Sequence, residues 1–342
     1  MTVEGNINKY LANYSVGDRW NIVSESYDGI DNVVVIPALA ESNHIFKALA
    51  SLSTNPRAEL ARTLIVCVIN NADMDNVPAD EFADNQYTLK VLDGRGQAPT
   101  LFDRIRQRGL RIAYVDASSP GLEMPGKTAG VGLARKIGMD LALGIFNREK
   151  DCPKLLFCLD ADTLVEHNYL SATREFFEKE RPVASVIAFT HQDAVSVEEQ
   201  AAICCYEIFL RYYVFGLRWA GSPYSFHSIG STMVCTTAGY AAVRGMNKRM
   251  AGEDFYFLDK LAKIGRIGRI STTTVHPSSR QSRRVPFGTG KRIISFTERE
   301  GINYTLYNPR SFAVLKEWIE YMSSCRDMDP ETILSHAGDM HP

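Results

Sequence analysis

Four short apolar runs dominate the first half of the chain, and polar or helical stretches separate them. The runs occupy residues 32–37, 63–69, 111–115 and 155–159. The first, Asn32-Val-Val-Val-Ile-Pro37, is rich in β-branched residues and apolar at consecutive positions, which is typical of a strand buried on both faces. Residues 41–53 and 128–146 show apolar positions at helical spacing. Strands that alternate with helices predict an α/β fold with a mostly parallel sheet and helices on both faces.

The second half of the chain has a mixed pattern. We expect strands over residues 182–189 and 266–275 and helices over 197–217, 252–264 and 309–322. Residues 70–109 form a long polar segment, for which no element is predicted. We therefore predict three parts, which are an N-terminal arm (1–30) packed on the body, an α/β domain (31–297) and a C-terminal helical extension (298–342).

The charge balance is nearly neutral, with 38 Lys and Arg against 40 Asp and Glu. A net charge of -2 provides no global field for nucleic acid or a membrane surface. The cysteine count, seven, is odd and includes no C-x-x-C pair, which favours free thiols in a reducing compartment. The polar N-terminus does not resemble a signal peptide, and no run reaches the roughly 18 apolar residues of a spanning helix. These features predict a cytoplasmic protein with no nucleic-acid partner and no transmembrane segment.

The most specific chemical feature is Asp160-Ala161-Asp162, which directly follows the apolar run 155–159. Ligands bind beyond the carboxyl ends of the strands in an open parallel sheet. Two carboxylates at that edge suit a hard dication with oxygen ligands, Mn²⁺ or Mg²⁺. A single acid after a strand is commonly a helix cap or a loop ion pair, but two acids after five apolar residues favour the metal.

Together with other motifs, this feature makes the chain resemble the family-2 glycosyltransferases and their GT-A relatives over about residues 32–292. Four motifs carry the resemblance in order: Val33-Val-Val-Ile-Pro37 with Glu41, Asp160-Ala161-Asp162, Gly230-Ser231, and Gly252-Glu253-Asp254-Phe255. The resemblance implies that residues 31–297 form a GT-A glycosyltransferase domain. It also implies a nucleoside-diphosphate sugar as donor.

The resemblance also implies roles for single residues. Pro37, Glu41 and Asp160 would lie by the donor, and Gly230 and Ser231 on the acceptor side. Asp162 would bind the metal together with His276, which follows a predicted strand. Alone, a histidine there is more often structural, and acids at Glu253 and Asp254 more often compensate a helix dipole. In inverting relatives the aspartate matching Asp254 deprotonates the acceptor hydroxyl, with Glu253 orienting the acceptor or a neighbour.

A basic segment follows His276. It contains Arg280, Arg283 and Arg284 and the turn Phe287-Gly-Thr-Gly290. Arginines and glycine amides suit phosphate, and the segment resembles the loop that closes over the donor in family-2 enzymes. The family's tryptophan after the arginines is absent, which does not favour a polymer-synthase subtype.

Two further positions are assigned to the donor. Asn71 stands where the family usually has an aspartate that reads the base, and an amide can still hydrogen-bond a base edge. Lys127 matches a family Gly-Lys at the start of a helix near the donor. The string from Gly121 to Thr128 also fits the P-loop pattern G-x-x-x-x-G-K-T, although Glu123 and Pro125 do not suit a phosphate cradle.

The sequence thus predicts a metal-dependent glycosyltransferase that moves a hexose-like sugar to a hydroxyl acceptor, inverting if Asp254 is the base. A retaining GT-A synthase of a small glycoside remains an alternative. Less favoured alternatives are an Asp-dependent phosphatase, a P-loop NTPase and a non-catalytic sugar-nucleotide binder. The acceptor is not readable from the sequence, and a homodimer is a candidate assembly.

Overall fold

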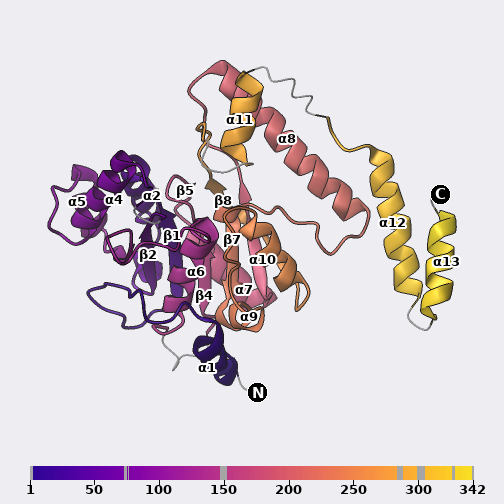
Figure 1. Cartoon of the computed structure of the whole chain (residues 1–342), viewed down its shortest axis with the longest axis horizontal. Coiled ribbons are helices and arrows are strands. Elements are labelled where there is room, and N and C mark those ends of the chain that lie inside the picture. Colours follow the sequence, from indigo (N-terminus) through magenta and orange to yellow (C-terminus); the bar gives the residue numbers. More distant parts are fainter. Residues whose placement is uncertain are drawn as a thin grey trace. The chain divides into compact units, whose positions relative to one another are not determined.

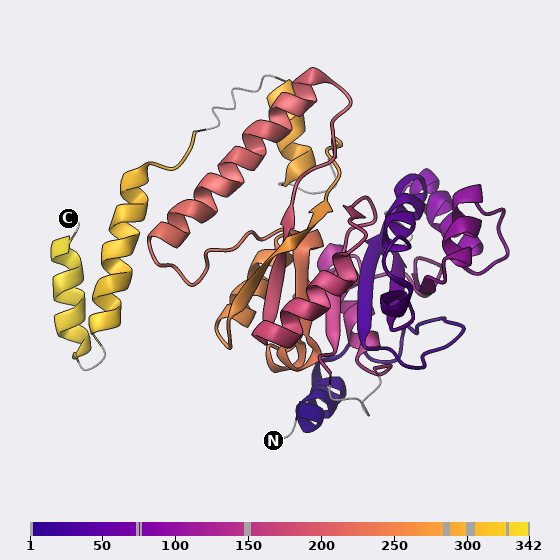
Figure 2. The ribbon, with the colours of Figure 1, turned by 180° about the vertical axis from the view of Figure 1, so that it is seen from behind.

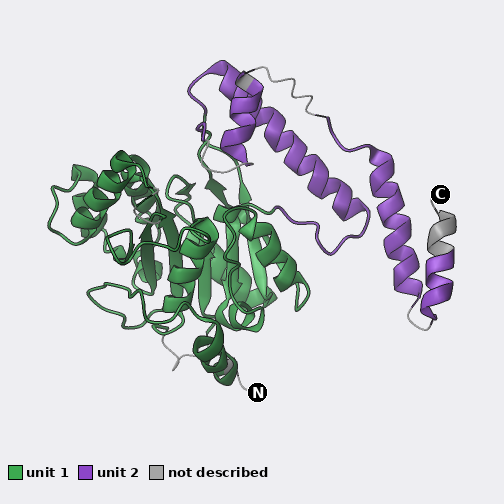
Figure 3. Cartoon of the chain, viewed as in Figure 1, with its two compact units in different colours: residues 1–193, 228–279, 284–287 green, residues 194–227, 280–283, 288–342 purple. Residues whose placement is uncertain are grey.

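The computed structural model describes residues 3–72, 75, 77–146, 152–282, 288–298, 305–325 and 328–340. The chain divides into two compact units (Figure 3). The sheet unit comprises residues 1–193, 228–279 and 284–287, and the helical unit comprises residues 194–227, 280–283 and 288–342. Residues 31–297, expected as one domain, therefore contribute to both units.

The described strands of the sheet unit form one eight-stranded sheet in the order β3-β2-β1-β4-β7-β6-β8-β5. Their bounds are β1 Asn32–Ala38, β2 Thr63–Asn70, β3 Arg111–Ala117, β4 Leu155–Cys158, β5 Leu164–Val165, β6 Ala184–Phe189, β7 Met233–Thr236 and β8 Ile267–His276. β7 and β5 are antiparallel to their neighbours, and the other neighbouring pairs are parallel. The predicted mostly parallel sheet is confirmed.

The central strands are buried on both faces. Every residue of β2, and every residue of β1 except Pro37, is buried. Successive side chains of a strand point to opposite faces, so both faces of the sheet are covered (Figures 1 and 2). On one face, Gly138 brings helix α6 (Val131–Ala142) close to the sheet, since a Cβ there would lie 2.9 Å from Cγ2 of Val68. The predicted α/β layering is thereby confirmed.

The sheet unit contains ten described helical segments. They are α1 Val3–Tyr14, α2 Ser42–Leu52, α3 Arg57–Leu60, α4 Ala79–Leu92, α5 Thr100–Gln107, α6 Val131–Ala142, α7 Tyr169–Glu180, the 3-10 helix η1 Gly230–Thr232, α9 Thr237–Ala242 and α10 Glu253–Ala262. The helices predicted near residues 41–53, 128–146 and 252–264 correspond to α2, α6 and α10. Helix α6 is shorter than predicted at both ends.

Two helices, α4 and α5, lie in the long polar segment 70–109, where no helix was predicted. Each follows a proline, Pro78 or Pro99, at its N-cap. The buried positions of α4 fall mainly in its last two turns, and α5 buries only Phe102 and Ile105. Such short apolar stripes are too weak to predict from periodicity, and packing such as that of Phe102 against Phe46 stabilises the helices instead.

The N-terminal arm is anchored by α1. The Tyr10 hydroxyl donates a hydrogen bond of 2.6 Å to Asp140 on α6, and Tyr240 of α9 donates another of 2.6 Å to the same carboxylate oxygen. Lys136 pairs with the other oxygen of Asp140 at 3.0 Å. These contacts hold the arm against α6 and α9 (Figure 1).

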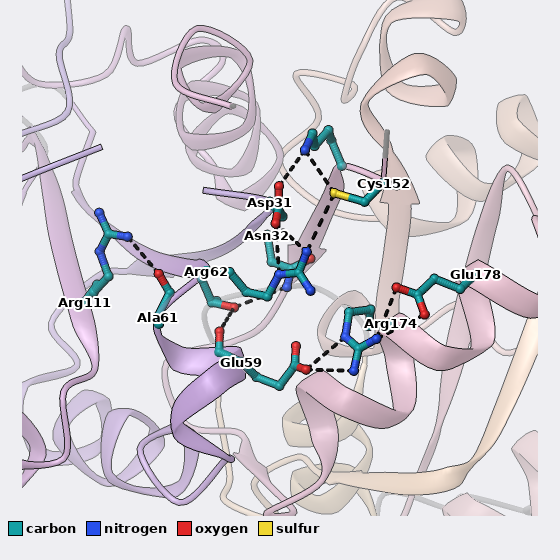
Figure 4. A network of polar contacts seen from close by, with 11 residues as sticks. Asp31, Asn32, Glu59, Ala61, Arg62, Arg111, Cys152, Arg174 and Glu178 are labelled. Atoms are coloured by element: carbon teal, nitrogen blue, oxygen red, sulfur yellow. Dashed lines mark hydrogen bonds and ion pairs between the residues drawn. The ribbon is translucent and has the colours of Figure 1, made fainter. Parts of the chain in front are cut away.

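A polar network closes the amino-terminal edge of the sheet (Figure 4). Asp31, just before β1, accepts a hydrogen bond of 2.9 Å from Nε of Arg62 and another from Lys154 just before β4. Burial alone would raise the pKa of Asp31, but these hydrogen bonds outweigh it and lower the pKa below its ordinary value. The network joins the starts of β1, β2 and β4, which leaves their carboxyl ends at the opposite edge.

The helical unit contains α8 Val197–Trp219, α11 Thr289–Thr297, α12 Pro309–Ser324 and α13 Pro330–Met340. Ala202 and Ile203 of α8 form a small core with Ile293 and Phe296 of α11. The helices predicted at residues 197–217 and 309–322 are confirmed as α8 and α12. Of the predicted apolar face of α12, only Phe312 is buried. Among the described residues, no helix combines the length and hydropathy needed to cross a bilayer.

Candidate active site

The predicted site residues gather mainly where parallel strands end. Strands β1, β2, β3 and β4 run in the same direction, so their carboxyl ends share one edge of the sheet. Asp160 follows β4 at that edge, and Glu41 follows β1. Helix α10 begins at Glu253 after Gly252, whose φ of 72° is in the left-handed region that favours glycine. The later acidic pair therefore sits on a sharply turned helix N-terminus.

A buried arginine joins the two acidic motifs. The Arg135 side chain on α6 is 2% exposed, and its guanidinium donates from Nη2 to Oδ1 of Asp160 and from Nη1 to Oε1 of Glu253. Gly230 makes room for it, because a Cβ at Gly230 would lie 2.9 Å from Cζ of Arg135. Segments 93 residues apart, at 160 and 253, are thus held at one point by a single side chain.

The acids near Arg135 are electrostatically perturbed. Burial raises the pKa of Glu253 to about 7; Arg135 opposes this shift and Asp254 adds to it. Burial also raises the pKa of Asp254, again against Arg135 and with the help of Asp160. Arg135 itself has a raised pKa, because the attraction of Asp160 and Glu253 outweighs its burial. A group of carboxylates with raised pKa values around a fixed cation is suited to proton transfer near neutral pH.

The shift at Glu253 predicts a pH-dependent stability. Between pH 4.5 and about 7 the unfolded chain ionises Glu253 while the folded chain keeps it protonated, so stability falls as pH rises through this window. At about 1.4 kcal/mol per pKa unit, the full contribution is roughly 3 kcal/mol. Urea unfolding of the wild type and Glu253→Gln at pH 5 and pH 7 measures it. We expect the variant to lose less stability over this interval, and equal losses would contradict the shift.

Asp162 and His276 come together at the end of β8. The side-chain amide of Gln192 donates hydrogen bonds of 2.7 Å to the backbone carbonyls of both residues. Strand β5 also pairs Leu164 directly with His276. The turn that carries Asp162 is therefore fixed beside the residue predicted to share its metal.

The side chains of Asp162 and His276 offer ligand atoms that fit a divalent cation. The Nδ1 atom of His276 lies 3.1 Å from the carbonyl oxygen of Thr190, and since a carbonyl only accepts, Nδ1 carries the proton. Nε2 is then the ring nitrogen on the side where a metal would bind. No group of three or more His, Cys, Asp or Glu side chains converges among the described residues. An ion held by one or two side chains would fill its shell with water and phosphate oxygens, as Mg²⁺ commonly does.

The predicted donor-side residues differ in their surroundings. Glu41 is the N-cap of α2 and lies 3.1 Å from the His44 ring, while Pro37 sits near the end of β1. Asn71 is 1% exposed, and its amide oxygen accepts hydrogen bonds from Ser118 and Asn85. A base edge would have to compete with these internal partners. The assignment of Asn71 to the base therefore stays a prediction.

Lys127 is exposed on the connection between β3 and α6. The backbone amide of Met124, in this connection, donates a hydrogen bond of 3.1 Å to the carbonyl of Asn71. The connection therefore passes the end of β2, which Asn71 directly follows. Helix α6 begins only at Val131, after the N-cap Gly130. In a P-loop the Gly-Lys opens the helix whose amides cradle phosphate. The geometry at Lys127 does not have that form.

The remaining predicted residues are Ser231 and the three arginines of the basic segment. Ser231, in η1, is fully buried, and its hydroxyl has no hydrogen-bond partner among the described residues. Arg280 belongs to the helical unit. Arg283 and Arg284 lie outside the described residues. A contact of these arginines with the donor stays a prediction.

Arg135 and Gln192 were missed by sequence reasoning. The one signal for Arg135 was a cation inside a predicted helix, between the apolar residues Ala134 and Ile137 and next to a second cation, Lys136. A charge at a fully buried position requires a partner, which could have marked it as a site residue. Gln192 follows β6 in a polar loop, and its sequence context has no comparable signal.

No family model and no curated protein matches this chain. Solved structures of S. aureus TarS are similar at 13% sequence identity. TarS 1–349 in complex with UDP-GlcNAc has a TM-score of 0.47, with 84% of this chain and 70% of that chain covered. TarS 1–349 alone has a TM-score of 0.46, with 91% and 80% covered. The complex of TarS 1–349 with UDP has a TM-score of 0.45 at 13% identity, with 84% and 70% covered.

Proposed function

We propose that this chain is a GT-A glycosyltransferase that transfers a sugar from a nucleoside diphosphate to a hydroxyl acceptor with inversion. One observation carries the proposal: Arg135 binds Asp160 of the first acidic motif and Glu253 of the second. A donor site at Asp160-Ala161-Asp162 and an acid-base site at Glu253-Asp254 would then lie within reach of one substrate. Asp160 lies beyond the end of β4, where α/β sheets bind ligands, and Arg135 holds Glu253 next to it.

In this proposal Asp254 is the general base. Its carboxylate stands in the first turn of α10, and its Oδ1 atom accepts a hydrogen bond of 2.7 Å from the amide of Phe255. Arg135 limits the rise of its pKa, which keeps a fraction of the carboxylate ionised. Glu253, fixed by Arg135, would orient the acceptor or a neighbouring side chain.

In this proposal Asp162 and His276 hold a divalent cation, with Mn²⁺ or Mg²⁺ as the candidates. When bound, the ion would neutralise the donor diphosphate as it leaves, which is Lewis-acid help. The carboxylate of Asp160 is oriented by Arg135 and would face the sugar side of the donor. TarS binds UDP-GlcNAc and UDP, so uridine-based donors are the first to test here.

The test is a thermal-shift screen of nucleotide sugars and free nucleoside diphosphates, with and without Mn²⁺, followed by titration calorimetry. A ligand at about 100 times its Kd should add roughly 2.7 kcal/mol to the stability of the wild type. Asp162→Ala should lose the Mn²⁺-dependent part of donor binding while its thermal transition stays cooperative. Donor binding that is the same with and without Mn²⁺, in both proteins, would contradict the metal assignment.

A further inference from the structure

Glu166 is a second carboxylate beside His276. It follows β5 directly, and β5 pairs antiparallel with β8, with Leu164 opposite His276 and Val165 opposite Val275. Side chains alternate across a strand, so Glu166 lies on the same face as Leu164 and its partner His276. The side chains of Glu166 and His276 are therefore neighbours on one surface of the sheet unit.

One carboxylate oxygen of Glu166 is held by β8. Its Oε2 atom accepts a hydrogen bond of 3.0 Å from the amide of Thr274, and the Thr273 hydroxyl lies 3.4 Å away. This part of β8 is irregular, because its register with β6 jumps from Ile187 opposite Ile270 to Ala188 opposite Thr274. The carboxylate thus occupies a backbone bulge, which fixes its orientation.

The other oxygen faces the imidazole. Oε1 of Glu166 lies 3.9 Å from Nε2 of His276, which is too long for a hydrogen bond. Two ligand atoms about 2.1 Å from a shared cation lie between about 3 and 4.2 Å apart, depending on the angle between them. Nδ1 of His276 contacts the Thr190 carbonyl, so Nε2 is the ring nitrogen that faces Glu166.

We propose that Glu166 joins His276 as a ligand of the divalent cation, as a second carboxylate in addition to Asp162. The side chains of Glu166 and His276 are partly exposed, at 39% and 33%, so an ion can enter and keep water ligands. A nitrogen ligand favours Mn²⁺ over Mg²⁺, which prefers oxygen alone. The existence of this ion site does not depend on the proposed function. Only its role does, which is to bring the ion to the donor diphosphate beside Asp162.

Mn²⁺ alone, without nucleotide, is the probe that tests the site. Electron paramagnetic resonance of free Mn²⁺ during titration gives the affinity of the full chain. We expect Glu166→Gln to weaken Mn²⁺ binding by about tenfold or more, since even partners outside a metal's own ligand set commonly contribute 10–100-fold. His276→Gln should show a similar loss, and the double variant should lose little more than either single variant. Mg²⁺ should compete only weakly.

The matched control is Glu178→Gln. Glu178 has a similar exposure of 43% and pairs with Arg174 in the same unit, away from His276. Its replacement should leave Mn²⁺ affinity unchanged. Glutamine at position 166 keeps an oxygen for the Thr274 amide, so the fold should survive. If it does not, Glu166→Asp keeps the charge on a shorter arm and should still bind Mn²⁺ more weakly than the wild type.

Wild-type Mn²⁺ affinity in Glu166→Gln, with loss of binding in His276→Gln, would overturn the proposal and leave Asp162 as the partner of the histidine. No Mn²⁺ binding by the wild type would overturn it as well, even if a nucleotide sugar is hydrolysed. Mn²⁺ binding that depends on Glu166, without binding of any nucleotide, would support the ion site and contradict the proposed function.

Discussion

Replacing Asp254 by asparagine should slow sugar transfer by about 10²–10⁴-fold while donor and metal binding change little. Asparagine is nearly isosteric, and its side-chain oxygen can still accept the hydrogen bond of the Phe255 amide. It cannot take a proton from the acceptor hydroxyl, so the loss should appear in kcat. The rate of glycosylated product formation from a nucleotide-sugar donor is measured at saturating Mn²⁺. Calorimetry gives the affinity for the donor.

Asp259→Asn on the same helix is the control. Asp259 pairs with Lys263 at 2.7 Å at the other end of α10, so its replacement should leave turnover nearly normal. If Asp254 serves only to compensate the helix dipole, its variant should lose roughly 0.3–1 kcal/mol of stability and keep its activity. Proton NMR of the product gives a second readout. Retention of the donor's anomeric configuration would remove Asp254 from the role of base.

Replacing Arg135 by methionine should destabilise the fold by about 3–5 kcal/mol at pH 7, because it leaves Asp160 and Glu253 without their shared cation. Lysine should not restore the site, since one ammonium cannot reproduce the two-sided contact of a planar guanidinium. Urea unfolding measures the stability, and Mn²⁺-dependent donor binding reports whether the site keeps its geometry. The free energy of unfolding and the donor affinity should both be lower in Arg135→Met.

The chain offers a matched arginine for comparison. Arg174 on α7 also joins two carboxylates, Glu59 and Glu178 (Figure 4), but it is 25% exposed against 2% for Arg135. Because solvent screens its pairs, Arg174→Met should cost clearly less. Adding Glu253→Gln to Arg135→Met should recover part of the loss, since it removes a buried carboxyl group that has lost its partner. An Arg135 variant no less stable than the Arg174 variant would contradict this account.

The sequence by itself determined the layered α/β fold and the local chemistry of the motifs. Apolar runs such as residues 32–36 and 63–69 are buried along their whole length, so they identify strands without knowledge of their neighbours. Asp160 and Glu253 could be placed after a strand and at a helix start for the same reason. Helices α4 and α5 escaped detection, because short buried stripes are stabilised by tertiary packing and leave little period in the sequence.

The tertiary structure alone decided which of these groups meet. Arg135 lies on a helix between the two acidic motifs in the chain, and only packing of α6 on the sheet brings its guanidinium to both. Gln192 likewise ties Asp162 to His276, and a bulge in β8 turns Glu166 toward the same ring. Periodicity reports whether a residue is buried, whereas a polar network depends on which elements meet and how strongly burial perturbs their charges.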